Sequence, residues 1–151
     1  MRSHTGYVMT LGGCPVHWAS KLQTEIALST GESEYIALAQ ALQELIPMCR
    51  LLDFFKGSFN LSEGDSVIVK SKIFEDNNGA ISMASTPQMT PCTKHIAVKY
   101  HFVKRYFGDN KFPDHPFFLE KIDTKEQKAD IFTKGLPADT FQYLCSLLCN
   151  Y

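Results

Sequence analysis

The chain has 151 residues, of which 44% are hydrophobic and 21% are charged, and its formal net charge is −1. This length predicts one domain, over residues 1–151, with a hydrophobic core, and the composition excludes a disordered chain. A net charge near zero excludes a global positive field that would attract nucleic acid, so any basic surface must be local.

The cysteines and the hydropathy pattern exclude further classes of protein. The five cysteines are odd in number and include no Cys-x-x-Cys pair, so neither a disulfide framework nor a zinc site is indicated. The sequence shows no signal peptide and no apolar run of membrane-spanning length. We therefore expect a soluble, cytoplasmic protein in a reducing compartment, with no membrane partner.

The N-terminal segment predicts a β-hairpin. The strand-like runs TGYVMTL and PVHWAS flank Gly12-Gly13, a dipeptide typical of a tight turn. No residue before Glu25 is acidic. The hairpin therefore offers no carboxylate to a functional site.

The pattern from Ile26 to Phe55 predicts a long helix. Ser29 and Glu32 match a capping box at its start. Glu34 lies at the margin of the apolar stripe that follows, and because Glu32 serves the cap, Glu34 is the carboxylate left for another role. An ordinary solvated glutamate is the alternative. Pro47 predicts a kink or a break. The apolar stripe consists of Tyr35, Leu38, Leu42, Leu45 and Ile46.

Residues 67–84 combine a strand, a break and a short helix. An apolar, β-branched run ends at Phe74 and predicts a buried strand, and a helical pattern resumes at Ala80. Asp76 lies between them, at the carboxyl end of the strand, where rigid backbone on both sides would hold a metal-binding carboxylate. A helix N-cap is the alternative role for Asp76, because aspartate favours that position.

The segment 94–107, KHIAVKYHFVKRYF, predicts a helix with an apolar and a basic face. Aromatic residues alternate with the cations, and such a surface suits a phosphate backbone and sugar faces. A solvated basic face without a ligand is the alternative. The candidate nucleic-acid-binding residues are Lys94, His101, Lys104 and Arg105.

The C-terminal third predicts a strand and two helices. Residues 117–122 form a compact strand pattern, and residues 124–127 match a second capping box, which opens a helix that carries Asp130. Residues 141–148 predict a last, apolar helix. The predicted order is strand, strand, helix, strand, helix, helix, strand, helix, helix.

Six blocks of the sequence resemble, in order and spacing, the ribonuclease H domain of copia-type (Pseudoviridae-like) LTR retrotransposon Pol polyproteins. The blocks are RSHTGYVMTLGG, HWASKLQ, ALSTGESEYIAL, EDNNGAI, TKHIAVKYHFV and KADIFTKGL. The resemblance implies an α/β fold of ribonuclease H type, a mixed sheet flanked by helices. It also implies hydrolysis of the RNA strand of RNA–DNA hybrids, beside the reverse transcriptase of the same polyprotein and within a virus-like particle if the element is active.

The family's acidic site would map onto Glu34, Asp76 and Asp130, which the resemblance implies are catalytic residues and Mg²⁺ ligands. Two Mg²⁺ ions about 3.5–4 Å apart can activate the attacking water and stabilise the leaving oxygen. Mg²⁺ takes oxygen ligands and keeps several waters, so a few carboxylates suffice. Acids gathered at one point repel one another, which makes such a cluster hard to explain on structural grounds alone.

The chain departs from the family at its start. The family's site has four acids, and the first lies on a first strand upstream of the block RSHTGY, with which this chain begins. The resemblance therefore implies an N-terminally truncated chain without competent catalysis. That strand lies mid-sheet in the family fold, antiparallel to the second strand and parallel to the one that ends at Asp76. We expect its absence to leave an unpaired slot and a poorly stable chain.

A second function from another class stays open at this point. It is a non-catalytic ribonuclease H-like relic or connection-type module, which would hold nucleic acid or a partner through its cations, Lys99 among them. Cleavage of a hybrid by an extended protein would distinguish the nuclease from this module.

Overall fold

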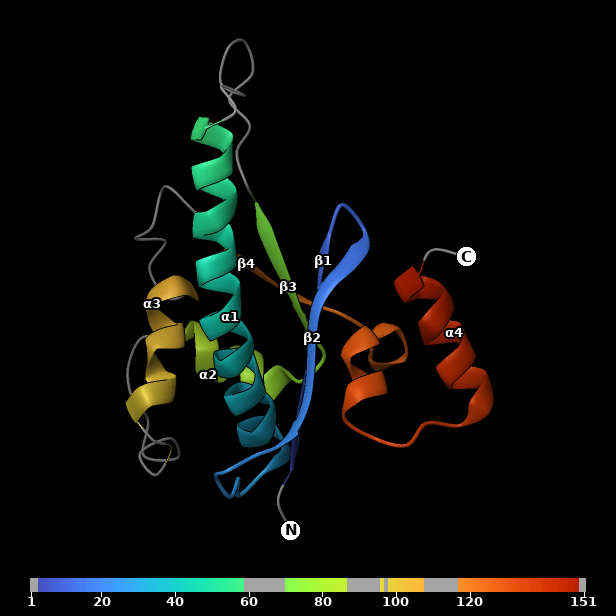
Figure 1. The fold of residues 1–151 in the computed structure, drawn as a ribbon. Helices are drawn as coiled ribbons and strands as arrows, with labels where there is room; N and C mark the ends of the chain where they lie inside the picture. Colours follow the sequence, from blue (N-terminus) through green and yellow to red (C-terminus); the bar gives the residue numbers. More distant parts are fainter. Residues whose placement is uncertain (1–2, 59–69, 87–95, 97, 108–116, 150–151) are drawn as a thin grey trace.

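The computed structural model describes residues 3–58, 70–86, 96, 98–107 and 117–149. The protein is mixed α/β, as predicted. Within the described ranges, no helix combines the length and the hydropathy needed to cross a membrane. The elements in chain order (Figure 1) are β1 (His4–Leu11), β2 (Cys14–Leu22), α1 (Thr30–Ser58), β3 (Ser71–Glu75), α2 (Asn78–Ser85), the 3-10 helix η2 (Val98–Val103), α3 (Lys104–Phe107), β4 (Phe117–Lys121), the 3-10 helices η3 (Thr124–Glu126) and η4 (Lys128–Phe132), and α4 (Ala138–Cys149).

The N-terminal hairpin is confirmed. β1 and β2 pair antiparallel, with Val8 opposite Trp18. Gly12 and Gly13 connect them with φ angles of 59° and 85°. Both angles lie in the left-handed region that glycine adopts without steric cost, so the Gly-Gly turn sets the register of the hairpin.

Helix α1 begins with the predicted capping box and forms the centre of the core. The Glu32 N–H donates to Ser29 Oγ (3.2 Å), and Glu32 Oε2 accepts from the Leu28 N–H (2.7 Å). Tyr35 and Leu42 are fully buried in the apolar cluster that α1 shares with α2, η2 and β4. Pro47 lies inside the helix, which continues to Ser58, so of the two predicted alternatives, a kink or a break, the break is wrong.

The described strands form two separate two-stranded sheets. β1 pairs with β2, and β3 pairs parallel with β4. Helix α1 contacts both sheets, since it packs on β1 and its Cys49 Sγ lies 3.3 Å from Ser71 Oγ at the start of β3. Figure 1 shows α1 alongside β3, with its N-terminal end next to the β1–β2 hairpin. Both sheets therefore pack against α1, although β1 and β3 are not hydrogen-bonded to each other.

Residues 127–132 also join the two sheets. Gln127 Nε2 donates to Phe74 O of β3 (3.3 Å), and Ser20 Oγ of β2 donates to Phe132 O (2.6 Å). A Cβ at Gly6 would collide with Thr133 Cγ2, so η4 lies directly against β1. The neighbours of Gly6 along the strand, Thr5 and Tyr7, are buried. Because side chains alternate along a strand, η4 and α1 cover opposite faces of β1.

Two predicted helices differ in the structure. The described part of the segment 94–107 is a 3-10 helix followed by one α-helical turn, and it does not form one continuous helix. The second capping box is also wrong, because the residue that caps η3 is Asp123, whose Oδ1 accepts from the Lys125 N–H (2.9 Å). Asp130 lies in the separate 3-10 helix η4. The predicted apolar face of the segment 94–107 is nevertheless buried at Ile96, Tyr100 and Val103.

Candidate active site

Asp76 lies at the point where β3 ends, as predicted, and it does not cap the next helix. The cap of α2 is Asn77, whose Oδ1 accepts from the N–H groups of Gly79 (2.8 Å) and Ala80 (3.2 Å). Asp76 is half-buried between the strand and this cap. The N-cap alternative for Asp76 is therefore wrong, and its carboxylate is left for another role.

Glu34, the second predicted acid, lies in the first turns of α1. Its side chain is half-buried. Burial raises the pKa of Glu34, and the nearby carboxylates of Asp76 and Asp130 raise it further, while Lys134 lowers it. The fold therefore gathers the three predicted acids, from α1, the end of β3 and η4, close enough for their charges to interact.

Asp130 has a cationic partner that sequence analysis missed. Its Oδ2 lies 2.7 Å from Lys134 Nζ, one helical turn along the chain, and its side chain is only 15% exposed. The i,i+4 spacing of an acid and a lysine is a signal that predicts this pair. Lys134 neutralises part of the negative charge that collects among the three acids.

Glu75 is a fourth carboxylate beside the three. It is the last residue of β3 and only 6% exposed. Burial raises the pKa of Glu75 to about 7, and the carboxylates of Glu34 and Asp76 act in the same direction. The N–H of Asn77 donates to its Oε1 (3.0 Å) and opposes the shift. Ile73 and Glu75 are two residues apart in a strand, so their side chains share one face. This spacing is a signal that the Glu75 side chain points into the core.

These acids form an open cluster. Among the described residues, no three His, Cys, Asp or Glu side chains stand in positions from which they could hold one metal ion together. Mutual repulsion between carboxylates favours separation, and the ion pair with Lys134 holds Asp130 on its own side. The donor atoms are nevertheless carboxylate oxygens, the ligands that Mg²⁺ prefers. The chemistry of the set fits a hard divalent cation, and its present spacing is wider than that of a closed site.

The buried carboxyl group of Glu75 predicts that stability falls as the pH rises. Its pKa is about 7 in the folded chain and close to 4.3 when unfolded, so the folded state binds more protons between these values. The free energy of unfolding should therefore decrease by on the order of 3 kcal/mol from pH 4.5 to pH 8, measured by urea denaturation with EDTA present. Glu75→Gln should remove most of this decrease. An equal decrease in the Gln variant would contradict the assignment.

The predicted basic face is only partly exposed. Lys94 lies outside the described residues. Lys104 is 8% exposed, and burial lowers the pKa of its ammonium group. His101 is half-buried, and its Nδ1 lies 3.3 Å from the hydroxyl group of Tyr35. The burial of Lys104 and His101 counts against direct contact with a nucleic acid.

Two cations of this segment remain on the surface. Lys99 is exposed and forms a 2.9 Å ion pair with Glu25. Arg105 is exposed as well. The predicted nucleic-acid surface is therefore reduced, among the described residues of this segment, to Arg105 and the paired Lys99.

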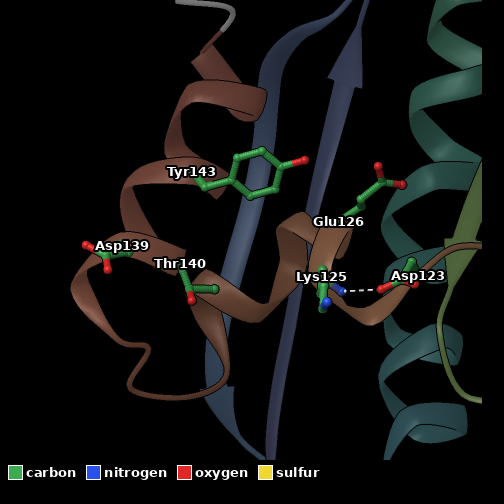
Figure 2. Close-up of a pocket in the computed structure, with 6 residues that line it drawn as sticks. All are labelled: Asp123, Lys125, Glu126, Asp139, Thr140 and Tyr143. Carbon is green, nitrogen blue, oxygen red and sulfur yellow. Dashed lines mark hydrogen bonds between the residues drawn. The ribbon is translucent and has the colours of Figure 1, made fainter.

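A groove of about 600 Å³ lies between η3 and α4 (Figure 2). In Figure 2 the ring of Tyr143 projects from α4 toward η3, while the Asp139 carboxylate points away from the ring. Neither Glu34, Asp76 nor Asp130 lines the groove, so it is separate from the candidate active site. Its lining residues are Asp123, Lys125, Glu126, Asp139, Thr140 and Tyr143.

Homologues of the chain are retrovirus-related Pol polyproteins of plants. One, the "Retrovirus-related Pol polyprotein from transposon TNT 1-94" of Nicotiana tabacum, is 34% identical over 97% of this chain and 10% of its own length. The Pol polyproteins from transposons RE1 and RE2 of Arabidopsis thaliana are each 31% identical, over 95% and 93% of this chain and 9% of their own lengths. The chain thus spans about a tenth of these relatives. No family model matches the sequence, and no solved structure matches it significantly.

Proposed function

We propose that the chain is part of a ribonuclease H-like domain of a retrotransposon Pol polyprotein, which hydrolyses the RNA strand of RNA–DNA hybrids with Mg²⁺. The observation that carries this proposal is the convergence of Glu34, Asp76 and Asp130 from three separate elements. The homology to Pol polyproteins supports it. The domain would act beside the reverse transcriptase of the same polyprotein, in the cytoplasm or a virus-like particle.

The three acids would hold the cations, and their neighbours would tune them. Bound divalent ions supply activation of the attacking water and stabilisation of the leaving oxygen. Glu34 would bind best when deprotonated, which its raised pKa makes harder without a cation. Lys134 would hold Asp130 through its 2.7 Å ion pair. The buried Glu75, next to Asp76 in the chain, would be a group that can be neutral near pH 7.

Among the described strands, one edge of β1 and one edge of β3 have no partner strand, which supports a ribonuclease H-like arrangement. Ile122 N–H donates to Glu75 O, so by alternation the peptide groups of Lys72 and Phe74 point away from β4. Gln23 N–H donates to Ser3 O, so those of Gly6 and Val8 point away from β2 by the same alternation.

The remaining element in this proposal is a strand between β1 and β3. It would run antiparallel to β1 and parallel to β3, would be covered by α1 and η4, and would carry the fourth acid that the resemblance implies. The 151 residues alone, with three of the four acids, would not cleave. Arg105, exposed on α3, would contact the phosphate backbone.

A hybrid-cleavage assay tests this function. The protein is the chain extended at its N-terminus by an aspartate-bearing strand, and the substrate is a 5′-labelled RNA annealed to DNA. We expect Mg²⁺-dependent cuts in the RNA strand, no cuts in duplex DNA, and no activity with EDTA or in the 151-residue chain. Binding of the hybrid without cleavage would contradict the nuclease and favour the non-catalytic nucleic-acid-binding module.

A further inference from the structure

Asn77 makes three kinds of contact at the acid site. Its side-chain oxygen caps α2, with acceptor distances of 2.8 Å to Gly79 N and 3.2 Å to Ala80 N. Its own N–H donates to Glu75 Oε1 at 3.0 Å. Its Oδ1 also lies where α2 meets the first turn of α1. One residue therefore links β3, α2 and α1 at the position next to Asp76.

The backbone on both sides of Asp76 is fixed by these contacts. On its N-terminal side, Glu75 O accepts from Ile122 N (3.1 Å), which extends the β3–β4 ladder. On its C-terminal side, Asn77 O accepts from Ile81 N (3.1 Å), the first main-chain bond of α2. Asp76 is thus the one residue between the end of a strand and a capped helix, and its direction depends on how the cap is formed.

Two glycines let α1 approach this cap. A Cβ on Gly79 would lie 3.0 Å from Asn77 Oδ1 and 3.6 Å from Gly31 Cα. A Cβ on Gly31 would lie 3.4 Å from the same Oδ1 and 3.5 Å from Gly79 Cα. The first turns of the two helices therefore meet at the Asn77 side chain. Because Glu34 follows one turn after Gly31, this contact also sets the distance between Glu34 and Asp76.

We infer that Asn77 is a positioning residue of the acid site: by capping α2 and seating the Gly31–Gly79 contact, it directs the Asp76 carboxylate toward Glu34. Asn77 itself holds no cation in this scheme. The role of this positioning in cation binding rests on the proposed function, because Asp76 is a cation ligand only there. The structural part of the inference, that Asn77 sets the side-chain direction of Asp76, can be tested without any metal.

The test compares Asn77→Ala, Asn77→Ser and Thr86→Ala in the full 151-residue chain. Serine caps helices about as well as asparagine, so Asn77→Ser is the rescue. Thr86→Ala is the matched control, because it removes the bond from Thr86 Oγ1 to Ser82 O (2.7 Å) at the other end of α2. Three-bond NMR couplings report the χ1 angle of Asp76, and Mn²⁺ titration reports affinity.

We expect one Asp76 rotamer in the wild type, in Asn77→Ser and in Thr86→Ala, and averaged couplings in Asn77→Ala. Mn²⁺ binding should weaken about 10- to 100-fold in Asn77→Ala alone, the usual effect of losing a residue that orients a ligand. An unchanged Asp76 rotamer in Asn77→Ala would overturn the inference. Rotamer averaging in Asn77→Ala without Mn²⁺ binding in any variant would support the positioning role and count against a cation site made by these three acids, so the two failures are distinguishable.

Discussion

Asp76→Asn is expected to lower the rate of hybrid cleavage by the strand-extended protein by at least about 100-fold, since a bound metal ion supplies several kcal/mol of transition-state stabilisation. Asparagine keeps the shape of the side chain and removes its charge. The fold should be unaffected, because the cap of α2 is formed by Asn77. The loss would therefore come from the missing carboxylate.

Asp123→Asn is the matched control for that substitution. Asp123 is also an aspartate at the start of a helical turn, with Oδ1 accepting from Lys125 N at 2.9 Å, and asparagine is an equally good cap. It lines the groove between η3 and α4, which none of the three acids lines. The variant should cleave at the wild-type rate. Equal cleavage by wild type and Asp76→Asn would reject the assigned site.

Supplying a strand between β1 and β3 is expected to raise the melting temperature by roughly 10 °C, if four or so new hydrogen bonds each contribute about 1 kcal/mol. The main-chain groups that would pair are those of Gly6 and Val8 on β1 and, on β3, those of Lys72 and the N–H of Phe74, because the Phe74 carbonyl already accepts from Gln127 Nε2 (3.3 Å). Circular dichroism melts of the 151-residue chain and of the N-terminally extended chain measure the difference.

An extension with two prolines at its centre is the control for added length. Proline lacks the N–H and is excluded from central strands, so this extension should give little stabilisation. A monomer of the 151-residue chain that melts cooperatively at high temperature, and whose melting temperature neither extension raises, would contradict an unpaired slot between β1 and β3.

Local sequence signals predicted the elements that position the site. The Gly12-Gly13 turn, the capping box at Ser29 and the strand that ends before Asp76 all depend on short-range chemistry, and each is present. The choice between neighbouring caps was harder. Asp76 and Asn77 are both good N-caps, as are Asp123 and Thr124, and the main-chain geometry at the helix start decides which side chain reaches the free N–H groups.

The burial of individual charged side chains could not be predicted from the sequence pattern. Glu75 is a charged residue that follows the apolar run, and Lys104 is one of the predicted nucleic-acid-binding cations, yet both are buried by elements distant in sequence. The segment that contains Lys104 is a 3-10 helix plus one α-turn. Its apolar residues Tyr100 and Val103 are buried as the helical pattern predicts, and Lys104 is buried with them. The ion pair of Asp130 with Lys134 could have been predicted from its spacing, whereas the field of Asp76 and Asp130 at Glu34 required the tertiary fold.

A crystal structure of the strand-extended protein grown with Mn²⁺, with the ions located by anomalous scattering, tests whether the three acids share a cation. We predict an anomalous peak at ligand distance, about 2–2.5 Å, from carboxylate oxygens of Glu34, Asp76 and Asp130. A structure at saturating Mn²⁺ in which these three carboxyl groups lie beyond the reach of a shared ion, or in which the ion binds elsewhere, would contradict it.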